Sequence, residues 1–438
     1  MGDVTIEPLA RPFSAVVRPP GSKSLTNRAL VLAALASGTS SLTNVLFADD
    51  TRVMLDDLTR LGFAIDIDEP ASVVRVTGAS GNIPATSADL FCGNSGTTIR
   101  FLTAMCSLGH GRYVLDGIER MRQRPIGELI DGLRHLGVRT EYAGEHGYPP
   151  VIVDADGLPG GMLLYGTAAS SQFLSAVAMI SPLARHEVRI ELTNRQTSWP
   201  YVVMTMRLMD EFGITPELIR DPITGEPRCI IIPRGNYHPF DYPIEPDASN
   251  ASYFLAAAAV NPGSKVTIQG LGRSSLQGDV GFADVLHRMG ANLVFGRDFI
   301  TLIGAEHLEG IDVDLANMPD TAQTLAVVAL FAEGPTNITG LRSLRVKETD
   351  RLAALCTELT SLGASVDIEN DDTLHIDPPV NVQSADIATY DDHRMAMSFA
   401  IAATRRNGIT IRDAQCVNKT YPNFFADFGK MLESKAQH

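Results

Sequence analysis

The feature that most constrains the fold is a segment of almost unbroken apolar residues that recurs six times along the chain. Each copy begins at polar residues suited to capping a helix and ends at a turn followed by a β-rich stretch. The copies are SLTNRALVLAALASGTSSLTNV, GTTIRFLTAMCSLGHGRYVLDG, SSQFLSAVAMISPLARHEVRIEL, SNASYFLAAAAVNPGSKVTIQG, DTAQTLAVVALFAEGPTNITG and DHRMAMSFAIAATRRNGITIRD. Their starts near Ser24, Thr97, Ser170, Ser249, Asp320 and Asp392 are 73, 73, 79, 71 and 72 residues apart, which indicates a repeated structural unit.

A second marker runs in step with the first. An apolar residue followed by glycine closes an amphipathic segment in TRLGFAI, RHLGVRT, DEFGITP, HRMGANL and TSLGASV. These glycines suit the position just after a helix, where the chain turns with positive φ into a strand. They are Gly62, Gly137, Gly213, Gly290 and Gly363.

Each unit is therefore predicted to hold several strands and two helices, one apolar and one amphipathic. A helix that is apolar on every side must be buried on nearly every side. Three units can meet this demand by packing their Ala-rich helices together, with the sheets and amphipathic helices outside. The proline-rich segment HPFDYPIEPDAS, residues 238–249, lies between the third and fourth units and marks a domain boundary. We expect an α/β protein of two domains with three units each.

Composition narrows the class of protein. The 438 residues, 45% of them apolar, can bury ample core, and no apolar run approaches the length of a membrane span. The net charge of −15 disfavours nucleic acid or an anionic membrane as a partner. The five cysteines are odd in number and form no Cys-x-x-Cys pair, so we expect neither a disulfide framework nor a zinc ribbon. We also expect no metal site and a cytoplasmic location.

The residues at the starts of the apolar segments point to an anion site. Helix N-termini offer free N–H groups and the positive end of the helix dipole, so several converging ends attract an anion. Lys23, in PGSKSLTNR, and Arg394, in DDHRMAMSFA, oppose that dipole, which favours an anionic ligand. The simpler alternative is a capped helix with a solvated lysine. PGSKS lacks the glycine spacing of a nucleotide P-loop, so a nucleotide phosphate is disfavoured.

Two basic stretches lie outside these starts. GIERMRQRPIGEL carries Arg120, Arg122 and Arg124, and LRSLRVKETDRL carries Lys347, Glu348 and Arg351. Such runs are often solvated charges. The spacing of Lys347, Glu348 and Arg351 at a helix start would also direct a carboxylate and an arginine fork into one cleft, and the two interpretations are evenly balanced on this stretch alone.

Taken together, these motifs resemble the enolpyruvyl transferase family, and within it the 3-phosphoshikimate 1-carboxyvinyltransferases (EPSP synthases). PGSKSLTNRAL, GNSGTTIRFL, RPIGEL, SSQFLSA, DASNASYFLAAAA, RVKETDRL, DDHRMAMSFA and NKTYPNFFADF occur in order over essentially the whole chain. The resemblance implies an inside-out α/β barrel of six βαβαββ units, three in each of two domains. Residues 1–21 with 245–438 would form the first domain and residues 22–244 the second, with the active site in the cleft between them.

The resemblance also implies a reaction. The enolpyruvyl (1-carboxyvinyl) group of phosphoenolpyruvate would move to the 5-hydroxyl of shikimate 3-phosphate, with release of phosphate, by addition and elimination through a tetrahedral intermediate and without a cofactor. We expect a monomer whose partners are these two small molecules. The phosphoenolpyruvate site would comprise Lys23, Asn94, Gly96, Arg124, Gln172, Arg351, Arg394 and Lys419.

The same resemblance assigns the second substrate and the acid–base groups. The catalytic residues would be Lys23, Asp320, Glu348 and His393, with Glu348 exchanging the proton at carbon and Asp320 deprotonating the hydroxyl. The shikimate 3-phosphate site would comprise Lys23, Ser24, Arg28, Ser170, Ser171, Gln172, Ser198, Tyr201, Asp320, Ser343 and Lys347.

Two alternatives remain open at this point. A UDP-N-acetylglucosamine enolpyruvyl transferase would share the fold and the donor, but that group usually carries a cysteine in the loop equivalent to residues 117–124, and GIERMRQR has none. A non-catalytic anion-binding relative would keep the fold without the chemistry. Against it, Lys23, Asp320, Glu348, Arg351 and Arg394 are all present together.

Overall fold

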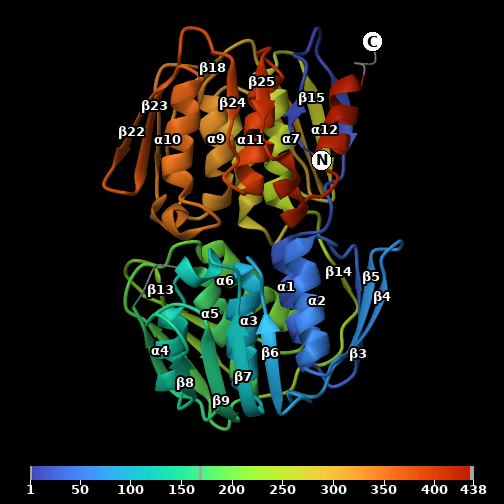
Figure 1. Ribbon diagram of the computed structural model, residues 1–438, viewed down its shortest axis with the longest axis vertical. Helices are drawn as coiled ribbons and strands as arrows, with labels where there is room; N and C mark the ends of the chain where they lie inside the picture. The colour runs from blue at the N-terminus through green and yellow to red at the C-terminus, as the bar shows by residue number, and fades with distance from the viewer. Residues whose placement is uncertain (1, 167–169, 435–438) are drawn as a thin grey trace. The chain divides into compact units, whose positions relative to one another are not determined.

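The chain forms two compact units in the computed structural model, which describes residues 2–166 and 170–434. One unit contains residues Met1–Pro20 and Glu245–His438, and the other Gly21–Ile244 (Figure 1). Gly21, which was expected to end the first segment of the first domain, is the first residue of the second unit in this division. It packs closely there: a Cβ on Gly21 would lie 1.9 Å from the carbonyl oxygen of Asn44. Of the helices in the described part of the chain, none is long and apolar enough to cross a membrane.

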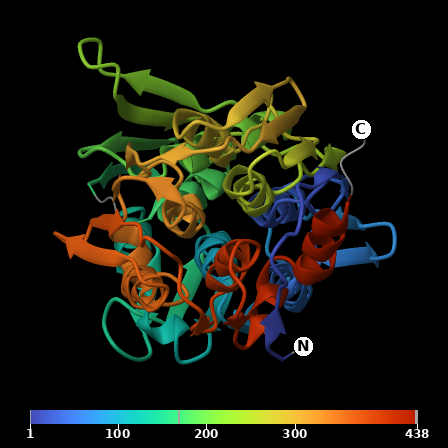
Figure 2. The ribbon, with the colours of Figure 1, turned by 90° about the horizontal axis from the view of Figure 1, so that it is seen from above.

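The six apolar segments form helices that are buried along their lengths, as their composition predicts. In the unit Gly21–Ile244, neighbours in this set pack against each other, α1 on α3 and α3 on α5; in the other unit α7, α9 and α11 pack mutually, and Figure 2 looks down their axes. The helices are α1 (Lys23–Leu35), α3 (Gly96–Cys106), α5 (Ser171–Ile180), α7 (Ala248–Val260), α9 (Ala322–Ala329) and α11 (His393–Ala403). The amphipathic helices that follow them are α2 (Asp49–Arg60), α4 (Gly127–His135), α6 (Trp199–Glu211), α8 (Phe282–Arg288), α10 (Arg351–Ser361) and α12 (Phe424–Glu433).

Five four-stranded sheets share one pairing pattern. In the unit Gly21–Ile244 the strands are β3 (Thr39–Thr43), β4 (Ala64–Asp68), β5 (Val73–Thr77), β6 (Ser87–Phe91), β7 (His110–Asp116), β8 (Arg139–Tyr142), β9 (Val151–Asp156), β10 (Gly161–Tyr165), β11 (Val188–Leu192), β12 (Glu217–Arg220), β13 (Pro227–Ile232) and β14 (Tyr242–Pro243). Their sheets have the orders β14-β3-β5-β4, β6-β7-β9-β8 and β10-β11-β13-β12. In each sheet the first pair is parallel and the next two are antiparallel.

The other unit repeats the pattern. Its strands are β1 (Val4–Thr5), β2 (Ser14–Val17), β15 (Lys265–Gln269), β16 (Asn292–Phe295), β17 (Phe299–Ile303), β18 (Leu308–Glu309), β19 (Asp312–Asp314), β20 (Ala332–Glu333), β21 (Thr336–Thr339), β22 (Ser365–Glu369), β23 (Thr373–Asp377), β24 (Ala385–Ile387) and β25 (Ile409–Ile411). The four-stranded sheets are β16-β17-β15-β2 and β19-β21-β23-β22, and β18 pairs with β20. The sixth repeat has the short sheet β1-β25-β24, in which the antiparallel strand comes from the start of the chain.

In each unit, one strand comes from the segment that precedes the first Ala-rich helix of the other unit. β2 precedes α1 in the sequence, yet it pairs in parallel with β15 of the unit that contains the C-terminal half. In turn, β14 precedes α7 and pairs in parallel with β3 of the unit Gly21–Ile244. The chain crosses between the units after Pro20 and after Ile244, where the Asp247 N–H donates to the Pro20 carbonyl oxygen at 2.8 Å.

The five glycines predicted to end amphipathic helices do so with left-handed backbone geometry, and this prediction is confirmed. Their φ angles are 91° at Gly62, 89° at Gly137, 91° at Gly213, 115° at Gly290 and 97° at Gly363. A side chain at such a position is strained whatever space is available, because Cβ collides with the backbone.

We expect Gly137→Ala to destabilise the protein by about 1–2 kcal/mol, because Ala is strained at φ 89° and its Cβ would lie 2.9 Å from Pro159 Cγ. Gly429→Ala is the matched control, since Gly429 lies inside α12 with no atom within 4 Å of the added Cβ. Alanine there should stabilise the helix by roughly 0.5–1 kcal/mol. Thermal unfolding midpoints of both variants check the opposite signs; equal shifts would contradict the helix-end assignment.

Candidate functional site

Hydroxyl groups cap two of the Ala-rich helices in the unit Gly21–Ile244, α1 and α5. Ser22 Oγ accepts from the Leu25 N–H at 3.5 Å, and Ser170 Oγ accepts from the Gln172 N–H at 3.3 Å. Lys23 is the first residue of α1, and its ammonium group lies 3.0 Å from the carboxylate of Asp50 on α2. Asp50 is buried, and it was not among the residues predicted from the sequence. Two acidic residues at a helix start are common, because they interact favourably with the helix dipole, so they gave no signal of a site.

Gly96 allows two arginines to approach the start of α3. A Cβ on Gly96 would lie 2.4 Å from Arg100 Nη1 and 2.6 Å from Arg124 Nη2. Both guanidinium groups are almost fully buried, and Arg124 Nη1 donates to the carbonyl oxygen of Asn94 at 3.1 Å. The GNSGT turn therefore gathers two positive charges at one helix end.

Gln172 joins this group from the start of α5. Its Oε1 accepts from Arg100 Nη1 at 3.0 Å, and its Nε2 donates to Thr97 Oγ1 at 3.2 Å. Arg100 also donates to the Gly96 and Pro125 carbonyl oxygens, at 2.9 and 3.0 Å. Arg100 was outside the predicted site, and it holds α3, α5 and the segment after Arg124 together.

Arg28 lies inside the unit rather than on its surface. It is 1% exposed, its Nε donates to Thr205 Oγ1 at 2.7 Å, and its Nη1 donates to the Ser24 carbonyl oxygen at 2.9 Å. Burial lowers the pKa of Arg28 to about 10. Its guanidinium carbon lies 5.1 Å from the Phe101 ring centroid and 6.0 Å from that of Tyr201. Arg28 thus ties α1 to α6 through neutral partners.

Other predicted residues of this unit lie at the same helix starts. Ser198 precedes α6 with φ 54°, in left-handed geometry, and Tyr201 lies in the first turn of that helix. Ser171 is the first residue of α5. Residues 167–169, next to Ser170, lie outside the described part of the chain.

In the other unit, Arg351 is the centre of a charge cluster. It is 1% exposed; its Nε donates to Asp392 at 2.7 Å, its Nη2 to Glu348 at 2.8 Å and its Nη1 to Asp320 at 3.3 Å. Burial alone would lower the pKa of Arg351, but the carboxylates of Asp392 and then Glu348 outweigh it and raise the pKa. Removing one member of such a buried cluster leaves uncompensated charge, which typically costs about 3–5 kcal/mol.

Asp320 collects three cations. Arg394 Nη2 donates to it at 2.8 Å, Arg351 is a second partner, and the Lys347 ammonium lies 3.7 Å away. On the other side of the cluster the Lys419 ammonium lies 3.9 Å from Glu348. The structure thus brings Asp320, Lys347, Glu348, Arg351, Arg394 and Lys419 into one cluster.

His393 and Ser343 complete the predicted set in this unit. His393 is 1% exposed at the start of α11, with Nδ1 3.7 Å from Asp392, whose carboxylate caps the helix by accepting from the Arg394 N–H at 2.8 Å. Ser343 lies on the 3₁₀ helix η5 (Arg342–Val346), which leads to Lys347. Lys23 and Arg394 both have carboxylate partners, so the dipole argument made from the sequence does not by itself require an external anion.

Asp279 is a further buried acid in this region that the sequence did not single out. It lies on the 3₁₀ helix η3 (Gly278–Gly281), is 3% exposed and accepts a hydrogen bond from the Ser249 hydroxyl at the start of α7. Burial, with the nearby negative charge of Asp320, raises the pKa of Asp279 to about 7. Within residues 2–166 and 170–434, no group of three or more His, Cys, Asp or Glu side chains is placed to hold a metal ion.

We expect the stability of the parent protein to fall, relative to Asp279→Asn, as pH rises from 4 to 7. The pKa of Asp279 is higher in the folded chain than in the unfolded one, so its ionisation opposes folding, and the penalty is complete above about pH 7. A shift of this size corresponds to roughly 2–4 kcal/mol. The check is the difference in unfolding midpoint between variant and parent at pH 5 and pH 8; Asp284→Asn, at an exposed position on α8, is the control. The same difference at both pH values would refute the prediction.

Comparison with known proteins places the chain in a family. The family model for EPSP synthase (3-phosphoshikimate 1-carboxyvinyltransferase) matches residues 9–428. The 3-phosphoshikimate 1-carboxyvinyltransferase of Vibrio vulnificus (strain YJ016) is 43% identical over 437 residues, which cover 99% of this chain and 100% of that protein. The chloroplastic 3-phosphoshikimate 1-carboxyvinyltransferase of Arabidopsis thaliana is 44% identical over 452 residues, which cover 100% of this chain and 85% of that protein.

Solved structures agree with the sequence relatives. An EPSP synthase from Acinetobacter baumannii matches with a TM-score of 0.80 and 26% identity, covering 98% of each chain. The enolpyruvyl transferase NikO from Streptomyces tendae, at 19% identity, shares the fold with a TM-score of 0.75 over 98% of each chain. The chain therefore belongs to the EPSP synthase family and has the α/β enolpyruvyl transferase fold.

Proposed function

We propose that this chain transfers the enolpyruvyl group of phosphoenolpyruvate to the 5-hydroxyl of shikimate 3-phosphate, giving 5-enolpyruvylshikimate 3-phosphate and phosphate. The observation that carries the proposal is similarity along the whole chain, at 43–44% identity, to proteins named 3-phosphoshikimate 1-carboxyvinyltransferase. The two clusters at the helix starts supply the charges that two anionic substrates require.

The proposed active site draws its residues from both units, which we take as the two domains. Phosphate of phosphoenolpyruvate is bound by Lys23, Arg124 and Lys419, and its carboxylate by Arg351 and Arg394. An arginine fork grips a carboxylate at two points, whereas lysine is a compact charge for phosphate. An incoming phosphate would share Lys23 with Asp50, and an incoming carboxylate would share Arg394 with Asp320.

Shikimate 3-phosphate is proposed to bind mainly at the starts of α1, α5 and α6. Its contacts would come from Ser24, Arg28, Ser170, Ser171, Gln172, Ser198 and Tyr201, with Asp320, Ser343 and Lys347 from the other unit. The burial of Arg28 makes its first role the orientation of Ser24, whose carbonyl oxygen it holds at 2.9 Å.

The acid–base groups are proposed to act in two steps. Glu348 protonates the methylene carbon of phosphoenolpyruvate, and the 5-hydroxyl attacks the adjacent carbon while Asp320 takes its proton, so a C–O bond forms. Glu348 then removes a proton from the new methyl group as the C–O bond to phosphate breaks, and the hydroxyl proton held by Asp320 leaves with the phosphate. Arg351 orients Glu348 at 2.8 Å, and Lys347, Arg351 and Arg394 surround Asp320. Lys23 and His393 are further candidates for proton transfer.

The proposed cellular setting rests on the cysteines. All five are free thiols, and four are buried, which suits the reducing cytoplasm. We propose a monomer because one chain supplies every residue of the proposed site.

The first test is to mix the protein with phosphoenolpyruvate and one acceptor at a time, and to measure phosphate. We expect release with shikimate 3-phosphate and none with UDP-N-acetylglucosamine. Release only with the sugar nucleotide would assign the chain to the other transferase, and release with neither acceptor would support an anion-binding relative.

The second test is Glu348→Gln, which keeps the side-chain shape and the contact with Arg351 but removes the proton donor. Positioned acid–base catalysis contributes about 10²–10⁴-fold, so we expect turnover to fall by that factor while shikimate 3-phosphate still binds. Glu306→Gln, at an exposed loop position, is the control and should retain full turnover. Normal turnover of Glu348→Gln, measured by phosphate release, would refute the assignment.

A further inference from the structure

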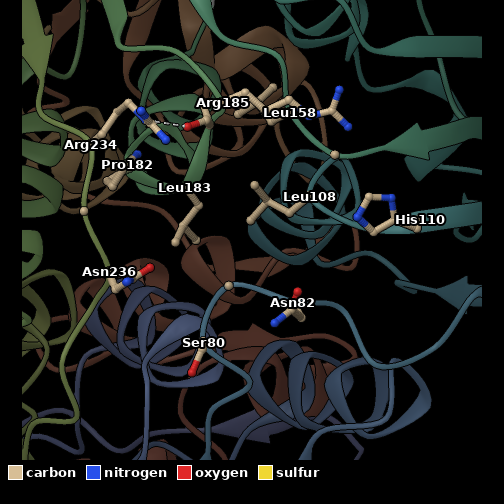
Figure 3. A pocket seen from close by; sticks show the side chains of 14 residues that line it. Ser80, Asn82, Leu108, His110, Leu158, Pro182, Leu183, Arg185, Arg234 and Asn236 are labelled. Atoms are coloured by element: carbon tan, nitrogen blue, oxygen red, sulfur yellow. Dashed lines mark hydrogen bonds between the residues drawn. The ribbon is translucent and has the colours of Figure 1, made fainter.

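A pocket lies at the carboxyl ends of the Ala-rich helices of the unit Gly21–Ile244, away from the helix starts that carry the candidate site. Its volume is about 490 Å³, within the range of small-molecule sites (Figure 3). Ser80 N–H donates to the carbonyl oxygen of Ala36 after α1, Leu108 follows α3, and Pro182 follows α5. All three repeats of the unit thus contribute to it, roughly one helix length, about 20 Å for α1, from Lys23.

Backbone hydrogen bonds within the third repeat and between it and the second repeat fix the shape of the pocket. The Arg185 N–H donates to the Leu158 carbonyl oxygen at 2.9 Å, and the Gly235 N–H donates to the Pro182 carbonyl oxygen at 3.0 Å. Gly81, with φ 80°, allows the wall to close: a Cβ there would lie 2.7 Å from Leu183 Cδ2. The pocket is therefore formed by the fold itself.

The floor of the pocket is apolar. Leu108 is 6% exposed, Leu158 is 1% exposed and Ala184 is 2% exposed, and Leu183 is half-buried beside them. Figure 3 shows Leu108 and Leu183 extending into the open centre. Leu183 has the most exposed surface of the four, so it is the side chain from which a ligand on this floor would chiefly remove apolar surface from water.

The rim is polar and basic. Its polar side chains are Ser80, Asn82, His110, Arg185, Arg234 and Asn236, and none of the residues lining the pocket is acidic. Asp156, beside the rim, pairs with His110 at 3.0 Å and with Arg185 at 3.9 Å. In a chain of net charge −15, the two arginines against one nearby carboxylate, Asp156, leave the rim locally positive.

Arg234 is oriented by the backbone. Its Nε donates to the Ala184 carbonyl oxygen at 3.1 Å, the dashed line in Figure 3, and no other hydrogen bond of its side chain is seen in the described residues. The two terminal nitrogens of the guanidinium group keep their N–H donors for another acceptor. A planar pair of donors matches the two oxygens of a carboxylate.

We propose that this pocket binds a small organic carboxylate, whose apolar ring or chain lies on Leu108 and Leu183 and whose carboxylate accepts from the terminal nitrogens of Arg234. Arg185, which pairs with Asp156 at 3.9 Å, is the second arginine at the rim. The proposal is independent of the proposed activity, because no residue of the pocket belongs to the candidate site.

The experiment titrates the full chain with benzoate, benzyl alcohol and inorganic phosphate, followed by ligand-observed NMR. We expect benzoate to bind with a dissociation constant on the order of 1–10 mM, as suits so small a ligand, and to bind more tightly than the other two. Arg234→Ala should weaken benzoate binding at least about tenfold. Any benzoate that binds at the candidate site would still bind in this variant. Only the benzoate binding that is lost with Arg234 is therefore assigned to the pocket.

The control is Arg189→Ala, which removes the same charge from the exposed face of β11, where Arg189 pairs with Glu191 at 2.6 Å. It should leave benzoate binding unchanged, and both variants should keep the parental thermal unfolding midpoint, which shows that they are folded. Equal benzoate affinity of Arg234→Ala and the parent overturns the proposal. Benzyl alcohol binding as tightly as benzoate overturns the role of the charge, and phosphate binding as tightly overturns the role of the apolar floor.

Discussion

The structure depends on burying six helices that have no polar side. Each Ala-rich helix must be covered all round, and a single βαβαββ unit cannot do this alone. Three units can, because their small side chains let the helices pack closely while each sheet covers one outer side. Side-by-side packing brings the helix starts to one end of each unit, as the contacts of Arg100 with Gln172 and of Arg394 with Asp320 show. The need to bury the helices thereby also creates two sites for charge.

Gathering helix starts concentrates the positive ends of their dipoles, and the two units balance this differently. The unit with the C-terminal half uses carboxylates: Asp247 and Asp392 cap α7 and α11, while Asp279 and Asp320 lie at adjacent starts. The unit Gly21–Ile244 uses hydroxyl caps at α1 and α5 and adds Arg100 and Arg124. One end is therefore rich in acids held by cations, which suits proton transfer, and the other is more cationic, which suits phosphate. This division gives a physical reason for assigning Glu348 and Asp320 the acid–base work.

The sequence predicted the features that follow from local pattern. The repeat, the buried helices and the glycines such as Gly137 each leave a mark within a few residues. The pairing of β2 and β14 does not, because nothing in either strand shows which sheet it joins. Asp50 and Asp279 were missed for a related reason: an acid near a helix start has an ordinary local explanation, and only the fold shows that it is buried beside Lys23 or Ser249. Arg28 lies in a recognisable motif, PGSKSLTNR, so its importance could be predicted. Its neutral, buried surroundings could not, because they come from α6, which lies far away in the sequence.

The two ends of the helices in the unit Gly21–Ile244 differ in how their unpaired backbone groups are satisfied, because the starts leave N–H groups unpaired and the ends leave carbonyl oxygens unpaired. At the starts, N–H groups need partners from outside the helix, and side chains such as Ser22 and Ser170 provide them. At the ends, close turns provide them: Gly81 N–H donates to the Leu35 carbonyl oxygen at 2.9 Å, and Gly109 N–H donates to that of Cys106 at 3.0 Å. Because backbone N–H groups of these turns already bond the last carbonyl oxygens of the helices, side chains are not needed as caps there. The side chains of these loops can therefore line a pocket. The starts of these helices therefore carry the side chains of the proposed active site, while the far ends form the pocket for which a different ligand is proposed.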